Sequence, residues 1–285
     1  MTAATTAAPR RRPRKNLLLS IVAVVVSIVV FVIPFLFMAI TAVKDRADAS
    51  LLNFSWPTHW AFVQNFKEVL EARDYMLIIA FINSTILTVV SIAILVVLAS
   101  MVAYVLQRRK SRWNAFINFM VLAGLIMPPA VVPTIWVLQK LGLFQTMPGL
   151  ILVEVAFGLS FCVLLFRAFI GSIPRDIDEA AIIDGASPTQ LFFRVIFPLL
   201  RSVVVTVIVV QSVAIFNDFQ NPLYFLPGDQ NATVQLTIYN FTSQFATAYN
   251  LLFMNILLIT IPPLIMFLFF NRQIVAGMTA GGVKG

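Results

Sequence analysis

Six long stretches dominated by hydrophobic residues run along the sequence. Each is long enough to cross a bilayer as a helix, which needs about 20 residues at about 1.5 Å rise per residue. The predicted spans are residues 17–43, 75–106, 113–138, 147–170, 200–219 and 249–271. Pro128, Pro129 and Pro133 are expected to kink the third span and Pro262 and Pro263 the sixth, because proline removes a backbone donor. The pattern predicts an all-α integral membrane protein with six transmembrane helices.

Composition supports this class. Of the 285 residues, 60% are hydrophobic and 11% are charged, whereas soluble domains carry about 25% charged residues. So little polar surface excludes a large soluble basic face. The net charge of +8 therefore indicates membrane topology rather than nucleic-acid binding.

The distribution of lysine and arginine predicts the orientation. With the N-terminus inside, the cytoplasmic segments hold 15 of the 20 basic residues and the outer segments hold 5, as the positive-inside rule requires. We therefore expect a multi-pass protein of a bacterial-type cell membrane with both termini in the cytoplasm. Residues 1–16 are predicted to form a disordered basic tail, residues 17–271 the six-helix transmembrane domain, and residues 272–285 a C-terminal tail. The first hydrophobic run is too long for a cleaved signal peptide.

A polar segment at about residues 174–198 separates the fourth and fifth spans and falls on the cytoplasmic side. Pro174 suits the first turn of a helix, and acidic residues at 176, 178 and 179 suit the positive end of its dipole. Gly185 suits a left-handed residue that ends the helix. A helix of about ten residues is expected here.

A second helix is expected directly after this turn. Ser187 precedes Pro188 and stands three residues before Gln190, which is the spacing of a capping box. Pro198 is expected to break or kink the chain before the fifth span. The segment therefore predicts a helix, a turn and a helix outside the membrane.

One face of the first helix combines small and acidic residues. Ile177, Ala180, Ala181 and Asp184 follow helical spacing. Two alanines leave room for another backbone to approach. From the residues alone, both a docking surface and an ordinary solvated or interfacial helix explain this face.

The same stretch resembles the EAA motif of permease subunits in binding-protein-dependent ABC importers. Glu179, Ala180 and Ala181 are followed by Gly185 and by an apolar pair before Pro198, and IPRDIDEAAIIDGAS is similar to the carbohydrate, maltose-permease-like branch. Further matches follow in order: Asn83-Ser84, Ala103-Tyr104, Pro222-Leu223 and the C-terminal AGMTAGGVKG. The resemblance implies the fold of a type I ABC importer permease.

The resemblance also implies how such a chain works. The permease couples closure of two ATP-binding subunits to alternating access, together with a second homologous permease, an extracytoplasmic solute-binding protein and a sugar substrate. ATP and Mg are expected on the ATPase subunits, because this sequence has no G-x-x-x-x-G-K-[ST] loop. The chain is thus expected to be a transport subunit without enzymatic activity, cofactor or metal. The expected coupling residues are Glu179, Ala180, Ala181, Asp184, Gly185 and Pro198.

Candidate residues for the substrate pathway lie in or beside the spans. Glu154 is an acidic residue inside the fourth span, where a carboxylate facing lipid would cost at least about 2.5 kcal/mol. A pathway role and a role in helix packing or near the headgroups both explain it. The other candidates are Asn83, Asn217, Asp218 and Phe219; polar helix ends and an interfacial aromatic belt are the alternative explanation for the last three.

Two other functional classes explain part of the sequence or lack the residues they need. A proton-coupled secondary transporter explains six spans and Glu154 but not the helical segment after the fourth span. A membrane-embedded enzyme needs a convergent catalytic set, which one histidine, His59, and one cysteine, Cys162, do not supply. Within the importer class, a non-sugar polar solute is the alternative substrate.

The outer segment 44–74 is long for a connection and contains Trp56, Trp60, Phe62 and Phe66. It is expected either to lie on the membrane surface or to contact the solute-binding protein.

Overall fold

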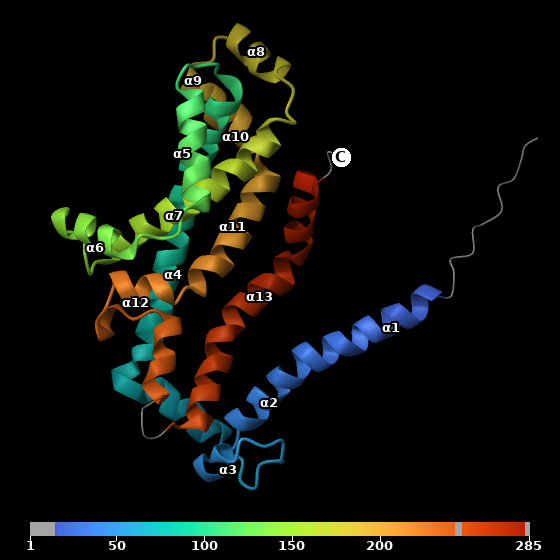
Figure 1. Ribbon diagram of the computed structural model, residues 1–285, viewed down its shortest axis with the longest axis vertical. Coiled ribbons are helices and arrows are strands. Elements are labelled where there is room, and N and C mark those ends of the chain that lie inside the picture. The colour runs from blue at the N-terminus through green and yellow to red at the C-terminus, as the bar shows by residue number, and fades with distance from the viewer. Residues whose placement is uncertain (1–14, 243–246, 283–285) are drawn as a thin grey trace, which may run out of the picture.

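The computed structural model describes residues 15–242 and 247–282, and this part of the chain is helical without strands. The N-terminal stretch consists of α1 (Lys15–Ser27), a short π-helix η1 (Ile28–Val32) and α2 (Ile33–Ala42). It leaves the helical body at an angle (Figure 1). Residues 19–36 are exposed, so this hydrophobic stretch joins the body only near its C-terminal end.

The next segment contains α3 (Arg46–Ser50) and the long helix α4 (Phe62–Arg108). Helical geometry is interrupted inside α4 at residues 72–75, where Arg73, Asp74 and Tyr75 have positive φ. The predicted second span therefore begins at the end of this break. The turns of α4 before the break belong to the outer segment of the prediction.

The third predicted span is bent more sharply than a kink. It consists of α5 (Asn114–Ile126) and α6 (Val131–Lys140), which meet at 117°. Pro128 and Pro129 lie in the four-residue break between them. Because proline fixes φ and cannot donate a backbone hydrogen bond, two consecutive prolines end the helix as well as bending it.

The fourth span is confirmed as α7 (Met147–Ile170). It is followed by α8 (Asp176–Ile183), α9 (Pro188–Gln190), the π-helix η2 (Leu191–Ile196) and α10 (Phe197–Leu199). The chain then bends by 74° into α11 (Arg201–Phe216). As expected for Pro198, the break lies just beyond it.

The last part begins with α12 (Gln220–Phe225) and two 3-10 helices, η3 (Asp229–Asn231) and η4 (Val234–Phe241). Helix α13 (Tyr249–Gly282) continues through Pro262 and Pro263. It also runs past residue 271, where the predicted sixth span ends. Residues 1–14 of the predicted N-terminal tail and 283–285 of the predicted C-terminal tail lie outside the described residues.

The described helices can account for up to six membrane spans. Four of them are individually long and apolar enough, namely residues 19–42, 62–108, 147–170 and 249–270. The two bent pairs, α5 with α6 and the 188–199 segment with α11, bring the total to six if each pair is one span.

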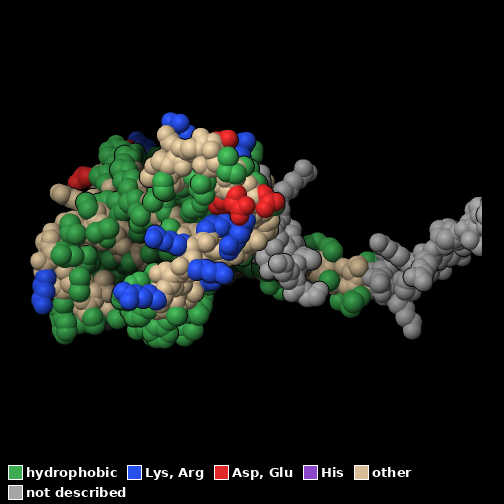
Figure 2. Space-filling model, turned by 90° about the horizontal axis from the view of Figure 1, so that it is seen from above, with side chains coloured by type: hydrophobic (Ala, Val, Ile, Leu, Met, Phe, Trp, Pro, Cys, Tyr) green, Lys and Arg blue, Asp and Glu red, His purple; other side chains and the backbone are tan. Residues whose placement is uncertain are grey.

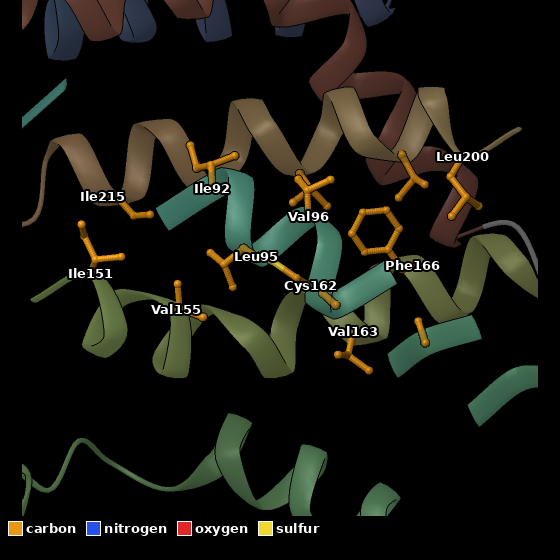
Figure 3. Packing of buried hydrophobic residues seen from close by; sticks show 14 of the residues in the cluster. Ile92, Leu95, Val96, Ile151, Val155, Cys162, Val163, Phe166, Leu200 and Ile215 are labelled. Atoms are coloured by element: carbon orange, nitrogen blue, oxygen red, sulfur yellow. The ribbon is translucent and has the colours of Figure 1, made fainter. Parts of the chain in front are cut away.

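The main core lies where α4, α7 and α11 pack together. Figure 3 shows Leu95 and Val96 of α4 beside Val155, Cys162 and Phe166 of α7. Ile215 and Leu200 approach from α11 and from the residue before it. Leu95, Cys162 and Phe166 are fully buried. This three-helix core supports α8, because a short turn joins α8 to the end of α7 and α8 contacts η2.

Candidate functional site

Helix α8 stands at one end of the molecule, which we call the α8 end (Figure 1). Its C-terminus is a Schellman motif: the Ala186 amide donates to the Ala181 carbonyl and the Gly185 amide to the Ile182 carbonyl, both at 3.0 Å. Gly185 has φ +80°, a value that favours glycine because other residues bring Cβ too close to the backbone. The predicted role of Gly185 as a left-handed helix stop is confirmed.

The second helix begins with the predicted capping box. The Gln190 amide donates to Ser187 Oγ at 3.4 Å, and the Ser187 amide donates to Gln190 Oε1 at 2.9 Å. These bonds satisfy backbone donors that have no partner in the first turn. Two local motifs therefore fix the turn between α8 and α9.

The expected coupling residues do not all face the same way. Glu179, Ala180, Asp184 and Gly185 are exposed, whereas Ala181 is half-buried against the main core. Pro198 is exposed in α10. The surface that α8 offers to a partner thus includes Glu179 and Ala180 but only part of Ala181.

Two isoleucines complete this outward surface. The side chains of Ile182 and Ile183 are 59% and 85% exposed, on a helix that lies between two predicted spans. Helical spacing alone does not mark them, because an isoleucine pair in a hydrophobic sequence resembles core. The signal that could have found them is their place next to Gly185, where the helix ends and the chain turns away.

The opposite side of α8 is tied to α4 by Asp178, which is buried. Nη2 of Arg108 lies 3.0 Å from Asp178 Oδ2, and the Tyr104 hydroxyl donates to Asp178 Oδ1 at 2.8 Å. Sequence reasoning assigned Asp178 only to the helix dipole. Its partners stand about 70 residues earlier in the chain.

Charged side chains are numerous on the face at the α8 end. Figure 2 shows basic side chains in a band across this face, with acidic side chains gathered beside them. Exposed basic residues of the loops and helices at this end are Arg109, Lys110, Arg112, Arg175, Arg194 and Arg201. The face therefore suits a partner that contacts both signs of charge.

The predicted pathway residues fall into separate groups. Glu154 is buried in α7 and accepts a hydrogen bond from Asn221 Nδ2 at 3.1 Å. Asp218 Oδ1 accepts the amides of Gln220 and Asn221 at 2.8 and 3.3 Å, which holds the first turn of α12. Asn221 thus joins Glu154 to the turn that carries Asp218.

Asn217 and Phe219 belong to a neighbouring group that faces η4. Gln235 Nε2 donates to Asn217 Oδ1 at 3.0 Å, and the ring centroids of Phe219 and Tyr239 lie 5.5 Å apart. Asn217 is exposed and Phe219 is half-buried. An amide pair and two aromatic rings therefore join the turn before α12 to η4.

Asn83 has a visible local role. Its Nδ2 donates to the carbonyls of Gln230 at 3.2 Å and Ala232 at 3.1 Å, and the neighbouring Ser84 Oγ accepts the Val234 amide at 3.0 Å. These bonds attach the η3–η4 segment to α4. A pathway role for Asn83 stays a prediction.

Comparison with known proteins places the chain among transport proteins. The profile of the family described as "Binding-protein-dependent transport system inner membrane component" matches residues 95–279. The melibiose/raffinose/stachyose import permease protein MelC of Bacillus subtilis is 31% identical over 88% of this chain and 91% of its own. The diacetylchitobiose uptake system permease protein NgcG of Streptomyces coelicolor is 32% identical over 87% of this chain and 82% of its own.

The fold is also found among solved structures. A bacterial ABC transporter involved in the import of the acidic polysaccharide alginate contains a chain that superposes with a TM-score of 0.78, covering 93% of this chain and 99% of that one at 18% identity. This likeness confirms the predicted all-α importer-permease fold. Together, the profile match and the relatives above 30% identity show that the chain belongs to the family of binding-protein-dependent transport system inner membrane components.

Proposed function

We propose that this chain is the transmembrane permease subunit of an ATP-driven ABC importer for a sugar or oligosaccharide, and that α8 couples ATPase closure to alternating access. One observation carries the coupling role: α8 exposes Glu179 and Ile183 outward while Asp178 is buried against α4. A short helix with a free outer face and a fixed inner face can receive force from a partner. The proposal places one of two ATP-binding subunits, with its ATP and Mg, against that outer face, and the other against the second permease.

A second homologous permease is part of this proposal. The hydrophobic stretch of residues 19–36 is exposed, and the bend between α5 and α6 exposes Ile126, Met127 and Trp136. Lipid covers part of such surface, but a backbone turn at membrane depth needs protein or water around its polar groups. A neighbouring permease at this bend would supply that cover.

The substrate class is proposed from the relatives and from the polar groups. MelC and NgcG carry the names of oligosaccharide transporters. In this chain, Glu154, Asn217 and Asp218 offer oxygen atoms that can accept hydrogen bonds from sugar hydroxyls, and Phe219 offers a ring face. An extracytoplasmic solute-binding protein is proposed as the donor. A second similar structure (TM-score 0.66) supports this, a bacterial alginate ABC transporter in complex with an alginate pentasaccharide-bound periplasmic protein.

The proposed orientation puts the α8 end in the cytoplasm. Ser111 and Thr189 are exposed near that end, and His59 is exposed in the segment between α3 and α4. In intact cells, Ser111→Cys and Thr189→Cys are expected to resist an impermeant thiol reagent, whereas His59→Cys is expected to react. The native Cys162 is buried and gives little background. After permeabilisation all three should be labelled; labelling of Thr189→Cys from outside would contradict the orientation.

Co-purification tests the assembly. A tagged chain extracted from its native membrane is expected to bring down an ATPase subunit and a second permease. Glu179→Ala is expected to recover several-fold less ATPase, because a charged contact of this kind orients a docking partner. Glu68→Ala is the matched control: it removes an exposed helical carboxylate from α4 before its break.

Uptake assays decide between the substrate classes. Labelled candidate sugars should enter reconstituted vesicles only with ATP inside and binding protein outside. Uptake driven by a proton gradient without ATP would instead support a secondary transporter, and ATP-dependent uptake of a different polar solute would correct the substrate class.

Glu154→Gln tests the pathway group. The amide keeps the size of the side chain and can still accept from Asn221 but removes a buried carboxylate, so we expect sugar uptake to fall about tenfold, the value of one charge-assisted hydrogen bond. Recovery of the ATPase subunit should not change. Normal uptake at normal abundance would remove Glu154 from the pathway, and a loss of abundance alone would assign it to helix packing.

A further inference from the structure

The contact between α8 and α4 is a small buried network. The side chains of Arg108 and Asp178 are only 12% and 10% exposed, and their charged groups approach to 3.0 Å. Tyr104, one helical turn before Arg108, reaches the other oxygen of the same carboxylate. Asp178 thus receives two partners from successive turns of one helix.

The same two residues of α4 also reach the segments on both sides of α8. Nη2 of Arg108 donates to the carbonyl of Ile173, before α8, at 2.9 Å. The Tyr104 ring lies 5.5 Å from the ring of Phe192 in η2, after α8. The C-terminal turns of α4 therefore hold α8 together with the segments that enter and leave it.

This contact fixes the orientation of α8 on α4 more than it stabilises the fold. Burying an ion pair is costly, so such a pair is weak support for the stability of a fold. The hydrogen bonds from Tyr104 to Asp178 and from Arg108 to Ile173 fix the relative geometry of the two elements. Asp178 is in the first turn of α8, and Glu179, the next residue, is exposed on the proposed docking surface. A force that a docked partner exerts on Glu179 is therefore applied one residue from Asp178, which attaches α8 to α4.

We infer that the Tyr104–Arg108–Asp178 contact makes α4 the element that carries the movement of α8 into the membrane domain. The inference rests on the proposed coupling function of α8. The three residues are positioning residues, because they are buried or half-buried and act through Glu179 and its neighbours. Movement would otherwise pass through the turns that join α8 to α7 and α9 and through the packing of α8 on η2.

The two routes predict different behaviour when the contact is lost. If α4 carries the movement, α8 without the contact still docks on the ATPase but swings on its two turns. ATP hydrolysis then continues while transport fails. If the chain connections carry the movement, the loss of the contact leaves the ratio of sugar transported to ATP hydrolysed unchanged.

The experiment uses the complete complex reconstituted in vesicles and compares Asp178→Asn with Asp176→Asn. Both replacements remove one acidic group from the first turn of α8, but Asp176 is exposed. We expect Asp178→Asn to lower uptake per ATP at least about tenfold, because Arg108 loses its buried charged partner, and Asp176→Asn to leave it within about twofold, as for an exposed charge. ATPase recovery should stay near the wild-type value in both.

A spectroscopic measurement follows α8 itself. Spin labels on Ser111→Cys, after α4, and Ile183→Cys, on α8, report the distance between the two elements; both positions are exposed. Because Ile183 lies on the proposed docking surface, the distance is measured before ATPase subunits are added. The distance distribution should broaden with Asp178→Asn and not with Asp176→Asn. Restoration by the exchanged pair, Arg108→Asp with Asp178→Arg, would further support the contact itself.

Tyr104→Phe keeps the inference testable if Asp178→Asn does not accumulate. It retains the ring against Phe192 and loses only the hydroxyl bond, for which we expect about a threefold fall in uptake per ATP. Unchanged uptake per ATP with a wild-type distance distribution, in whichever variant is obtained, would overturn the inference. Absence of an ATPase subunit from the wild-type complex would overturn the proposed function instead.

Discussion

Replacing Gly185 with valine is expected to remove most ATP-driven uptake while the chain still reaches the membrane. Gly185 has φ +80°, and no atom lies within 4 Å of the position that a Cβ would occupy, so the effect comes from the backbone. A left-handed conformation costs roughly 1–2 kcal/mol for ordinary residues and more for a β-branched one. The Schellman bonds of α8 would be strained and α9 would leave at another angle. Recovered ATPase and uptake are the measurements.

Gly142→Val is a closely matched control. Gly142 has φ +68° and equally open surroundings. It also ends a helix, α6, with the same pair of bonds: its amide donates to Gln139 and the next amide donates to Leu138. Both variants carry the same local strain, but only one is beside α8. An equal loss of uptake in the two variants would show that backbone strain at either helix end reduces transport, and that the orientation of α8 and α9 is not the cause.

Local signals in the sequence predicted much of the α8 region. Ser187 with Gln190, and Gly185 after an acidic-led helix, are motifs whose bonds span a few residues. Such motifs form the same way wherever they stand in a fold. The break near Pro128 has an equally local cause, since consecutive prolines interrupt a helix.

What the sequence could not predict depends on distant partners. From the sequence, Asp178 was assigned only to the first turn of a helix. In the structure its carboxylate contacts Tyr104 and Arg108, which stand 70 or more residues earlier. Asn83 was predicted only as a pathway candidate, and its hydrogen bonds to carbonyls about 150 residues later have no local signal. Polar side chains in spans have several possible partners, and hydrophobic periodicity does not select among them. The size of the 117° turn after α5 also exceeds the kink expected from Pro128, Pro129 and Pro133.

Replacing Gly149 with alanine is expected to destabilise the fold more than the same replacement at the other described glycines. Gly149 is in the first turn of α7, where a Cβ would lie 2.0 Å from the backbone carbonyl oxygen of Leu143. That oxygen accepts from Thr146 Oγ1 at 2.7 Å, and Thr146 in turn caps the Gly149 amide at 3.2 Å. The methyl group would push apart the turn that joins α6 to α7. We expect a cost of about 3 kcal/mol or more, at or above the usual range for overpacking.

Gly158→Ala in the same helix separates this clash from the general effect of alanine. Its Cβ would lie 3.0 Å from the end of the Leu95 side chain, a milder approach than the one to the Leu143 backbone, and alanine favours the helix by about 1 kcal/mol over glycine. Thermal unfolding in detergent and abundance in the membrane measure both. Gly149→Ala should be scarce and unfold many degrees earlier, whereas Gly158→Ala should stay close to the wild type. If both variants behave alike, the turn before α7 is free to adjust, and the close approach of Leu143 to Gly149 is not what fixes the start of this helix.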